Sequence, residues 1–219
     1  AQLLGQQHID RLAEQLVTPV AKQQLGLVID DHDLALAVQH AHERGIIHRD
    51  LTPANIMFVH DPRTQIESVK ILDFGIAKFV EDDVALTQSG VVVGTPRYMS
   101  PEQCLGEQQE PRSDAYSLGI LLFESLTGAW PYRAEAASRQ AIFDAHVYEK
   151  PKSLREEWPD APVELVALLH ELLDKSVAAR PEIVDVAKRL DQIRSALFPG
   201  TTPDALPQRD QPDRRQHRQ

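Results

Sequence analysis

The chain has 219 residues, of which 42% are hydrophobic and 26% are charged, as is ordinary for a globular protein. Its 33 acidic and 23 basic residues give a net charge of −10, which makes it a poor candidate for binding nucleic acid through phosphate contacts. One cysteine, Cys104, excludes an intrachain disulfide, and no apolar run approaches the roughly 20 residues of a membrane span.

Two helices are predicted at the start of the chain. Apolar residues at helical spacing indicate one over residues 6–17, which Pro19 ends. A second is predicted over residues 20–44, for which Gly45 is a good C-cap. Residues 29–33 read IDDHD; this stretch lacks the central glycine of a calcium loop and is predicted to be a solvated insertion.

Short strands and a long loop are predicted next. Residues 46–60 and 69–73 read as strands around a turn at Asp61-Pro62. Residues 73–102 show no sustained periodicity, and an irregular stretch of that length in a compact domain is typical of a functional loop.

The remainder is predicted to be helical up to residue 197. Helices are expected over residues 113–126, 134–147, 163–174 and 183–197, and the first, which is strongly apolar, should be the most buried. From Pro199 the composition turns to proline, glutamine and charged residues, which predicts a disordered tail over residues 199–219.

Side chains suited to phosphoryl transfer lie in two segments. HRDLTPANIMF, residues 48–58, contains Asp50 and Asn55, and ILDFGIAK, residues 71–78, contains Asp73. Transfer of a phosphoryl group from a nucleotide needs a carboxylate that orients the acceptor hydroxyl and oxygen ligands that hold Mg²⁺. Each residue alone also has an ordinary interpretation as a turn, cap or loop residue, so the hypothesis depends on their joint occurrence.

These motifs together carry a family resemblance. HRD, an asparagine at the fifth position after its aspartate, and a later DFG resemble the catalytic-loop and metal-loop signatures of protein kinases. AHERGIIHRDLTPANIM looks like the serine/threonine kinases found in bacteria. Residues 94–103 (GTPRYMSPEQ) look like the family's peptide-positioning loop, residues 113–132 like the long buried helix of its large lobe, and residues 168–181 like its penultimate helix and arginine loop.

The resemblance implies a fold and roles for matching residues. The fold is mainly α, a protein-kinase-like C-terminal lobe in which a short β element carries the catalytic and metal loops. Asp50 would be the catalytic base or would orient the acceptor hydroxyl. Asn55 and Asp73 would ligate Mg²⁺, and Met57 would lie under the adenine ring of ATP. Thr95 would lie beside Asp50 in the peptide-positioning loop, where a threonine is typical of serine/threonine kinases.

Three more residues match scaffold positions of the family. Glu102 and Arg180 would form a buried ion pair that fixes the peptide-positioning loop. Asp114 would hold the backbone of the catalytic loop from the N-terminus of the buried helix.

The chain departs from the family in two places. Thr52 stands where serine/threonine kinases have a lysine that touches the transferred phosphate, and Ala54 is not the arginine that tyrosine kinases use instead. The chain also has no G-x-G pair for a glycine loop, and Lys22, the only lysine before Asp50, is interpreted as a surface helix residue. The 49 residues before Asp50 are too few for a small lobe, so we expect the large lobe alone, with little kinase activity by itself.

The resemblance therefore implies a transferase, a serine/threonine protein kinase that moves the γ-phosphate of ATP to hydroxyls of protein substrates with ATP and Mg²⁺ as cofactors. A missing small lobe and a cytoplasmic location are implied, and the full-length protein could carry a membrane anchor. A pseudokinase-type binding scaffold and an inactive truncated fragment are the alternatives. The expected domain limits are residues 1–33 for an N-terminal helical segment, 34–198 for the large lobe and 199–219 for the tail.

Overall fold

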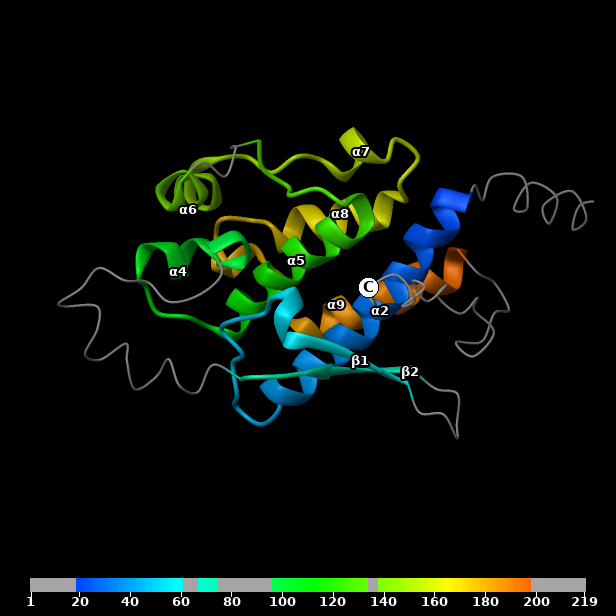
Figure 1. Ribbon diagram of the computed structural model, residues 1–219, viewed down its shortest axis with the longest axis horizontal. Helices are drawn as coiled ribbons and strands as arrows, with labels where there is room; N and C mark the ends of the chain where they lie inside the picture. Colours follow the sequence, from blue (N-terminus) through cyan, green and yellow to red (C-terminus); the bar gives the residue numbers. More distant parts are fainter. Residues whose placement is uncertain (1–18, 61–66, 75–95, 134–137, 198–219) are drawn as a thin grey trace, which may run out of the picture.

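Helices dominate the computed structural model, which describes residues 19–60, 67–74, 96–133 and 138–197 (Figure 1). In chain order its elements are α2 (Pro19–His42), η1 (Pro53–Asn55), β1 (Ile56–His60), β2 (Glu67–Ile71), η3 (Pro96–Tyr98), α4 (Pro101–Leu105), α5 (Pro111–Thr127), α6 (Arg139–Tyr148), α7 (Leu154–Glu157), α8 (Val163–Leu172), η4 (Val177–Ala179) and α9 (Ile183–Leu197). The predicted fold class, mainly α with a short β element, is confirmed.

The helix predicted over residues 6–17 and the tail predicted over residues 199–219 lie outside the described residues. None of the described helices combines the length and the apolar character needed to cross a bilayer.

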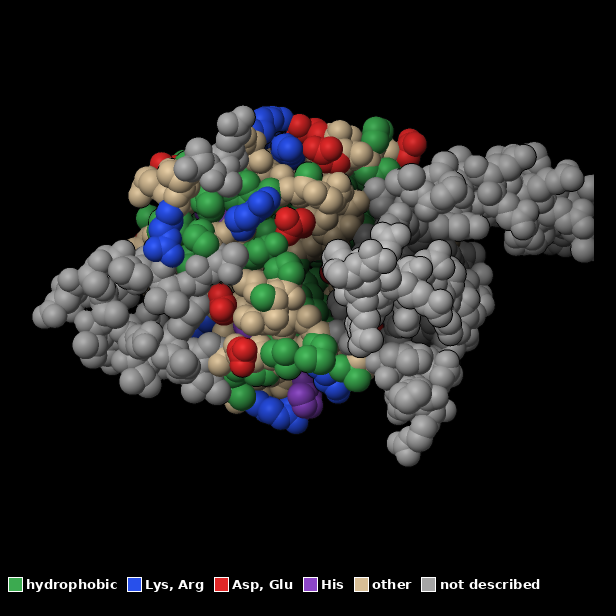
Figure 2. Space-filling model, viewed as in Figure 1, with side chains coloured by type: hydrophobic (Ala, Val, Ile, Leu, Met, Phe, Trp, Pro, Cys, Tyr) green, Lys and Arg blue, Asp and Glu red, His purple; other side chains and the backbone are tan. Residues whose placement is uncertain are grey.

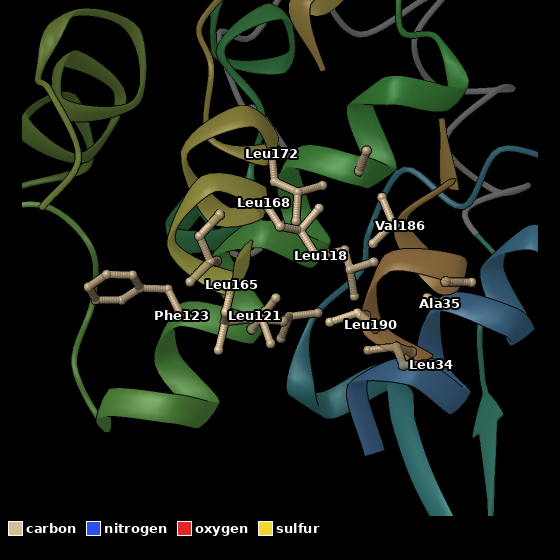
Figure 3. Close-up of a cluster of buried hydrophobic side chains, with 14 of the residues drawn as sticks. Leu34, Ala35, Leu118, Leu121, Phe123, Leu165, Leu168, Leu172, Val186 and Leu190 are labelled. Atoms are coloured by element: carbon tan, nitrogen blue, oxygen red, sulfur yellow. The ribbon is translucent and has the colours of Figure 1, made fainter. Parts of the chain in front are cut away.

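Helix α5 is the central element of the lobe. Every residue from Ser113 to Phe123 is buried, and α2, α8 and α9 pack around the helix (Figure 1). Leu118 of α5, Leu168 of α8 and Leu190 of α9 belong to one hydrophobic cluster (Figure 3). A helix that is apolar on nearly all sides is stable only where other elements cover it. The prediction that this helix is the most buried one is confirmed.

Helices α5 and α8 approach each other closely at Gly119. A Cβ atom at this position would lie 2.8 Å from the Cβ of Leu172, which is too close for two carbon atoms to pack. The missing side chain at Gly119 therefore sets the distance at which the leucines of α8 meet α5.

Helix α2 is continuous from Pro19 to His42, so the IDDHD stretch is helical and its prediction as a solvated insertion is wrong. Asp31 is only 5% exposed, and its Oδ2 accepts a hydrogen bond at 2.8 Å from the hydroxyl of Ser125 on α5. The sequence alone does not show whether an aspartate is solvated or accepts a hydrogen bond from a neighbouring helix, which is why the prediction failed. The expected domain limit at residue 33 falls inside this helix, and Lys22 lies within it.

Strands β1 and β2 pair as an antiparallel hairpin in which Ile56 lies opposite Ile71. Ile56, Val69 and Ile71 pack against the main hydrophobic cluster, whereas Met57 and Val59 remain 45% and 37% exposed. This alternation is the period of two that a strand imposes on its side chains. Figure 2 shows hydrophobic side chains gathered over the hairpin on the outer face. The hairpin expected from the sequence is confirmed, but its first strand begins at Ile56 and not at residue 46, because residues 46–55 form a loop and the turn η1. The turn of the hairpin lies outside the described residues.

A buried ion pair joins α4 to the segment between η4 and α9. Nη1 and Nη2 of Arg180 donate to the two carboxylate oxygens of Glu102 at 2.8 and 2.9 Å, as predicted. Its other three N–H groups donate to the carbonyls of Asp174, Arg112 and Lys175, so all five donors of the guanidinium are paired. Burial alone would raise the pKa of Glu102, but the hydrogen bonds and charge of Arg180 lower it below its ordinary value.

The Arg180→Leu variant should lose about 3–5 kcal/mol of unfolding free energy, because the Glu102 carboxylate stays buried without its partner. Thermal melts followed by circular dichroism measure the loss. Arg133→Leu is the matched control, since its ion pair with Glu156 has side chains 68% and 44% exposed and should add little to stability. Equal melting midpoints for wild type and Arg180→Leu would contradict the assigned role.

Candidate active site

The candidate catalytic loop, residues 48–55, follows the C-terminal end of α2. Gly45 has a φ of 72° and donates its N–H to the carbonyl of His42 at 2.9 Å. Glycine adopts this left-handed conformation at little cost, which is why it ends helices so often. The predicted C-cap is confirmed, and the chain turns there from α2 into the loop.

Asp114, in the first turn of α5, holds the catalytic loop by its backbone. Its side chain is 1% exposed, Oδ2 accepts the N–H of His48 at 2.8 Å, and Oδ1 accepts the N–H of Arg49 at 2.8 Å. Oδ2 also lies 2.8 Å from Nε2 of His42 at the end of α2. A carboxylate is further favoured in the first turn of a helix by the helix dipole. The scaffold role predicted for Asp114 is confirmed.

Arg49 is held on both sides of its backbone in an uncommon conformation. Its φ is 66°, and Arg49 and Asp73 are the non-glycine residues of the described part with positive φ. Its N–H is bound by Asp114, and its carbonyl accepts Nε2 of Gln103 at 2.7 Å. Such strained residues persist where the surroundings over-determine them, and they cluster at functional sites.

Asn55 connects Asp50 to the neighbour of Asp73. Its Nδ2 donates to the carbonyl of Asp50 at 2.8 Å and lies 3.4 Å from the Asp50 carboxylate. Its own carbonyl accepts the N–H of Leu72 at 2.8 Å. The two segments that hold the candidate residues are therefore hydrogen-bonded to each other.

His48 makes a second connection between the same segments. Its Nδ1 accepts the N–H of Asp50 at 3.3 Å, and its Nε2 donates to the carbonyl of Leu72 at 3.0 Å. Its ring also lies 4.9 Å from the ring of Phe74, measured between centroids. Leu72 is thus bound at both its N–H and its carbonyl, and this fixes the point at which Asp73 leaves the strand.

Asp73 and Asn55 offer oxygen atoms that suit a hard cation. Asp73 has a φ of 50° and an exposed side chain. Because Asn55 uses Nδ2 on Asp50, its Oδ1 is the atom left to bind an ion. The described residues contain no group of three or more histidine, cysteine, aspartate or glutamate side chains placed to hold a metal. A pair of oxygen donors fits Mg²⁺, which keeps waters and phosphate oxygens in its shell.

The remaining sequence-predicted residues differ in their positions. Met57 lies on the exposed face of β1, whereas Thr52 is 3% exposed, so the lobe itself encloses it. The carbonyl of Thr52 accepts the N–H of Asn55 at 3.0 Å and closes the turn η1. Thr95 lies outside the described residues.

The sequence analysis assigned no role to Gln103 or His42. Gln103 binds the carbonyl of Arg49, and His42 binds the carboxylate of Asp114. Gln103 also accepts the N–H of Ser100 at 2.8 Å, which forms a capping box at the start of α4. The S-x-x-Q spacing of Ser100 and Gln103 is a known signal for a helix start and could have predicted α4. Burial raises the pKa of Cys104 to about 12, which keeps its thiol protonated and unsuited to act as a nucleophile.

Comparisons with known proteins point to one family. A family model described as protein kinase domain matches residues 8–190. The serine/threonine-protein kinase pkn3 of Myxococcus xanthus is 41% identical over 157 residues, which are 69% of this chain and 28% of that protein. The serine/threonine-protein kinase PknB of Mycobacterium leprae is 37% identical over 173 residues, or 79% of this chain and 26% of that protein. The chain spans less than a third of the length of these relatives.

Asp114→Asn should loosen the catalytic loop, because an amide has one oxygen to offer where the carboxylate offers two. One of the N–H groups of His48 and Arg49 then loses its partner, at a cost of about 1–3 kcal/mol. Hydrogen exchange of these two amides should accelerate. Asp144→Asn, the same change on the exposed face of α6, should leave both rates unchanged. Unchanged exchange in Asp114→Asn would show that this side chain does not hold the loop.

Proposed function

Because this chain belongs to the protein kinase family, we propose that it provides the catalytic lobe of a serine/threonine protein kinase. The proposed reaction moves the γ-phosphate of ATP to a serine or threonine hydroxyl of a protein. The observation that supports it most is the pair of hydrogen bonds at Leu72. They connect the catalytic loop to the residue before Asp73, where a carboxylate base and metal ligands have to lie close to each other.

Asp50 is the group proposed to orient the acceptor hydroxyl and to take its proton. Its backbone N–H and carbonyl are held by His48 and Asn55, so the carboxylate is positioned before any substrate binds. Asn55 Oδ1 and the Asp73 carboxylate are proposed to hold Mg²⁺. When bound, this ion neutralises charge on the phosphates. A partly buried loop strengthens these electrostatic contributions relative to water.

The nucleotide and the protein substrate are proposed to bind on two sides of Asp50. Met57, exposed on β1, would lie against the adenine ring. Residues 94–103, which contain Thr95, are proposed to position the protein substrate. Of these, Pro96 to Gln103 belong to the described part, and Glu102 ties them to the core through Arg180.

Thr52 favours the second candidate, a kinase-like scaffold that binds without useful catalysis. Serine/threonine kinases carry a lysine here, and the loss of its charge should weaken stabilisation of the developing phosphoryl anion. Thr52 is enclosed by its own lobe, so a longer cationic side chain at this position would have to extend out of the loop.

The lobe is proposed to begin with α2, because this helix crosses residue 33 without a break, and to end near residue 198. Residues 199–219 are proposed to be a tail. A small lobe is proposed to complete the nucleotide site. Since ATP is the proposed phosphate donor, we place the lobe in the cytoplasm.

Joined to the small lobe of one of its relatives, the chain should transfer phosphate, and Asp50→Ala should lower the rate about 10²–10⁴-fold. Asp73→Ala should abolish Mg²⁺-dependent nucleotide binding, measured by calorimetry with and without a chelator. Asp144→Ala is the control for loss of a carboxylate elsewhere on the lobe. Full activity in both Asp50→Ala and Asp73→Ala would mean that the roles assigned to them are wrong.

The 219 residues alone should show no transfer above the Asp50→Ala background in a radiolabel assay with generic protein substrates. Without a cover over the nucleotide, the phosphates stay hydrated and the electrostatic stabilisation is weakened. Activity that appears only with a joined small lobe supports the kinase. A joined chain that stays silent until Thr52→Lys is introduced supports the scaffold, and transfer by the chain alone contradicts the need for a second lobe.

A further inference from the structure

Three consecutive carbonyls, those of the segment Pro96–Tyr98, are bound by three side chains from elsewhere in the lobe. The donor–acceptor pairs are Nε2 of His146 with Pro96 at 2.9 Å, Nε1 of Trp130 with Arg97 at 3.0 Å, and the hydroxyl of Ser117 with Tyr98 at 2.8 Å. Ser117 lies on α5, Trp130 follows α5, and His146 lies on α6, which packs against this segment and lies beside α4 (Figure 1). One side-chain donor for each carbonyl fixes the segment from its core side.

The orientation of His146 is determined by a chain of hydrogen bonds behind it. A carbonyl only accepts, so Nε2 carries a hydrogen. Burial and the charge of Lys175 lower the pKa of His146 to about 4, so Nδ1 carries none at neutral pH. Nδ1 therefore accepts from the hydroxyl of Tyr116, 2.9 Å away. This uses the one hydrogen of Tyr116, so Tyr132 donates to Tyr116 across 2.5 Å.

Lys175 starts this chain. Its Nζ donates to the Tyr132 hydroxyl at 3.0 Å and to the carbonyls of Ala145 and His146 at 3.2 and 2.5 Å, which uses all three of its hydrogens. Burial lowers the pKa of Lys175 to about 8, which leaves the amine protonated at neutral pH. Both carbonyls lie near the C-terminal end of α6, where a cation is favourable. In the series Lys175, Tyr132, Tyr116, His146 and Pro96, each residue therefore donates a hydrogen bond to the next.

The chain is also connected to the buried ion pair. Nη2 of Arg180 donates to the carbonyl of Lys175 at 3.1 Å, and the Arg180 guanidinium lies 4.9 Å from the centroid of the Tyr116 ring. Arg180, which pairs with Glu102, therefore contacts two residues of the hydrogen-bond chain that ends at Pro96. The segment before α4 and α4 itself are held by one connected network.

We propose that His146 is a positioning residue for the protein substrate, acting through its hydrogen bond to the Pro96 carbonyl, with its ring oriented by Tyr116, Tyr132 and Lys175. This rests on the proposed function, in which the loop containing Pro96–Tyr98 receives the substrate. A segment fixed before binding pays less conformational entropy when a peptide docks on it. Loss of the His146 donor leaves the Pro96 carbonyl with only the longer bond from the N–H of Met99, at 3.3 Å within the same turn, and so unties the segment from α6. Peptide affinity then falls while the nucleotide site is unaffected.

Two substitutions of similar size separate this role from simple core packing. In His146→Gln the side-chain amide reaches about as far as Nε2, so it can donate to Pro96. In His146→Asn the amide reaches only about as far as Nδ1, so it can meet Tyr116 but not Pro96. Trp130→Phe and Ser117→Ala each remove one of the other two donors with small changes of shape, and they serve as comparison variants that keep His146 intact.

The first measurement uses the chain joined to a small lobe, with a peptide substrate and steady-state kinetics. His146→Asn should raise the KM for peptide about 3- to 10-fold, the worth of one hydrogen bond. Its kcat and its KM for ATP should stay within about 2-fold. His146→Gln should restore the peptide KM to near wild type. A fall in kcat in both variants, or equal peptide KM values for Asn and Gln, would overturn the proposal.

The second measurement uses the 219-residue chain and needs no activity, so it tests the hydrogen bond of His146 to Pro96 even if the joined wild-type protein is silent and the proposed function fails. Nitrogen-15 NMR of wild type should show His146 with its hydrogen on Nε2. The backbone amide signals of Arg97, Tyr98 and Met99 should shift in His146→Asn and remain in place in His146→Gln. The other tautomer, or unchanged amide signals in a folded His146→Asn protein, would overturn the inference.

Discussion

The buried guanidinium of Arg180 is the group on which the half of the lobe that contains α4 depends. Removing such a charge from water is costly, and the cost is recovered only when its donors meet well-placed acceptors. Here the five donors reach Glu102 and three backbone carbonyls, which lie in three separate segments of the chain. A single side chain therefore fixes the relative positions of α4, the start of α5 and the segment before η4.

Asp114 has the corresponding role for the candidate catalytic loop, where a buried negative charge replaces the positive charge of Arg180. One buried carboxylate collects two backbone N–H groups of the catalytic loop and the ring of His42. Because Asp114 lies in the first turn of α5, the loop is attached to the same helix whose leucines form the core. The most buried helix of the lobe thus positions the candidate catalytic loop.

The scaffold and the chemistry of this lobe depend on different residues. Asp50, Asn55 and Asp73 lie in segments that hydrogen bonds connect, and none of those bonds uses the side chain of Thr52. The side chain at position 52 is therefore not needed to hold these segments together. The same fold is compatible with a catalyst and with a binding scaffold, so the fold alone does not decide between them.

Local signals in the sequence determined the helical fold, the hairpin, the C-cap at Gly45 and, through a family resemblance, the pairing of Glu102 with Arg180. The spacing of apolar residues predicts these elements because helices and strands each bury side chains at a fixed period along the sequence. Tertiary structure alone decided that Asp31 is buried, that Gln103 holds the carbonyl of Arg49 and that His146 binds Pro96. A polar side chain looks the same in sequence whether it faces water or a partner 50 residues away. Only the packing of α2 against α5, of α4 against α6 and of α6 against η3 brings such partners together.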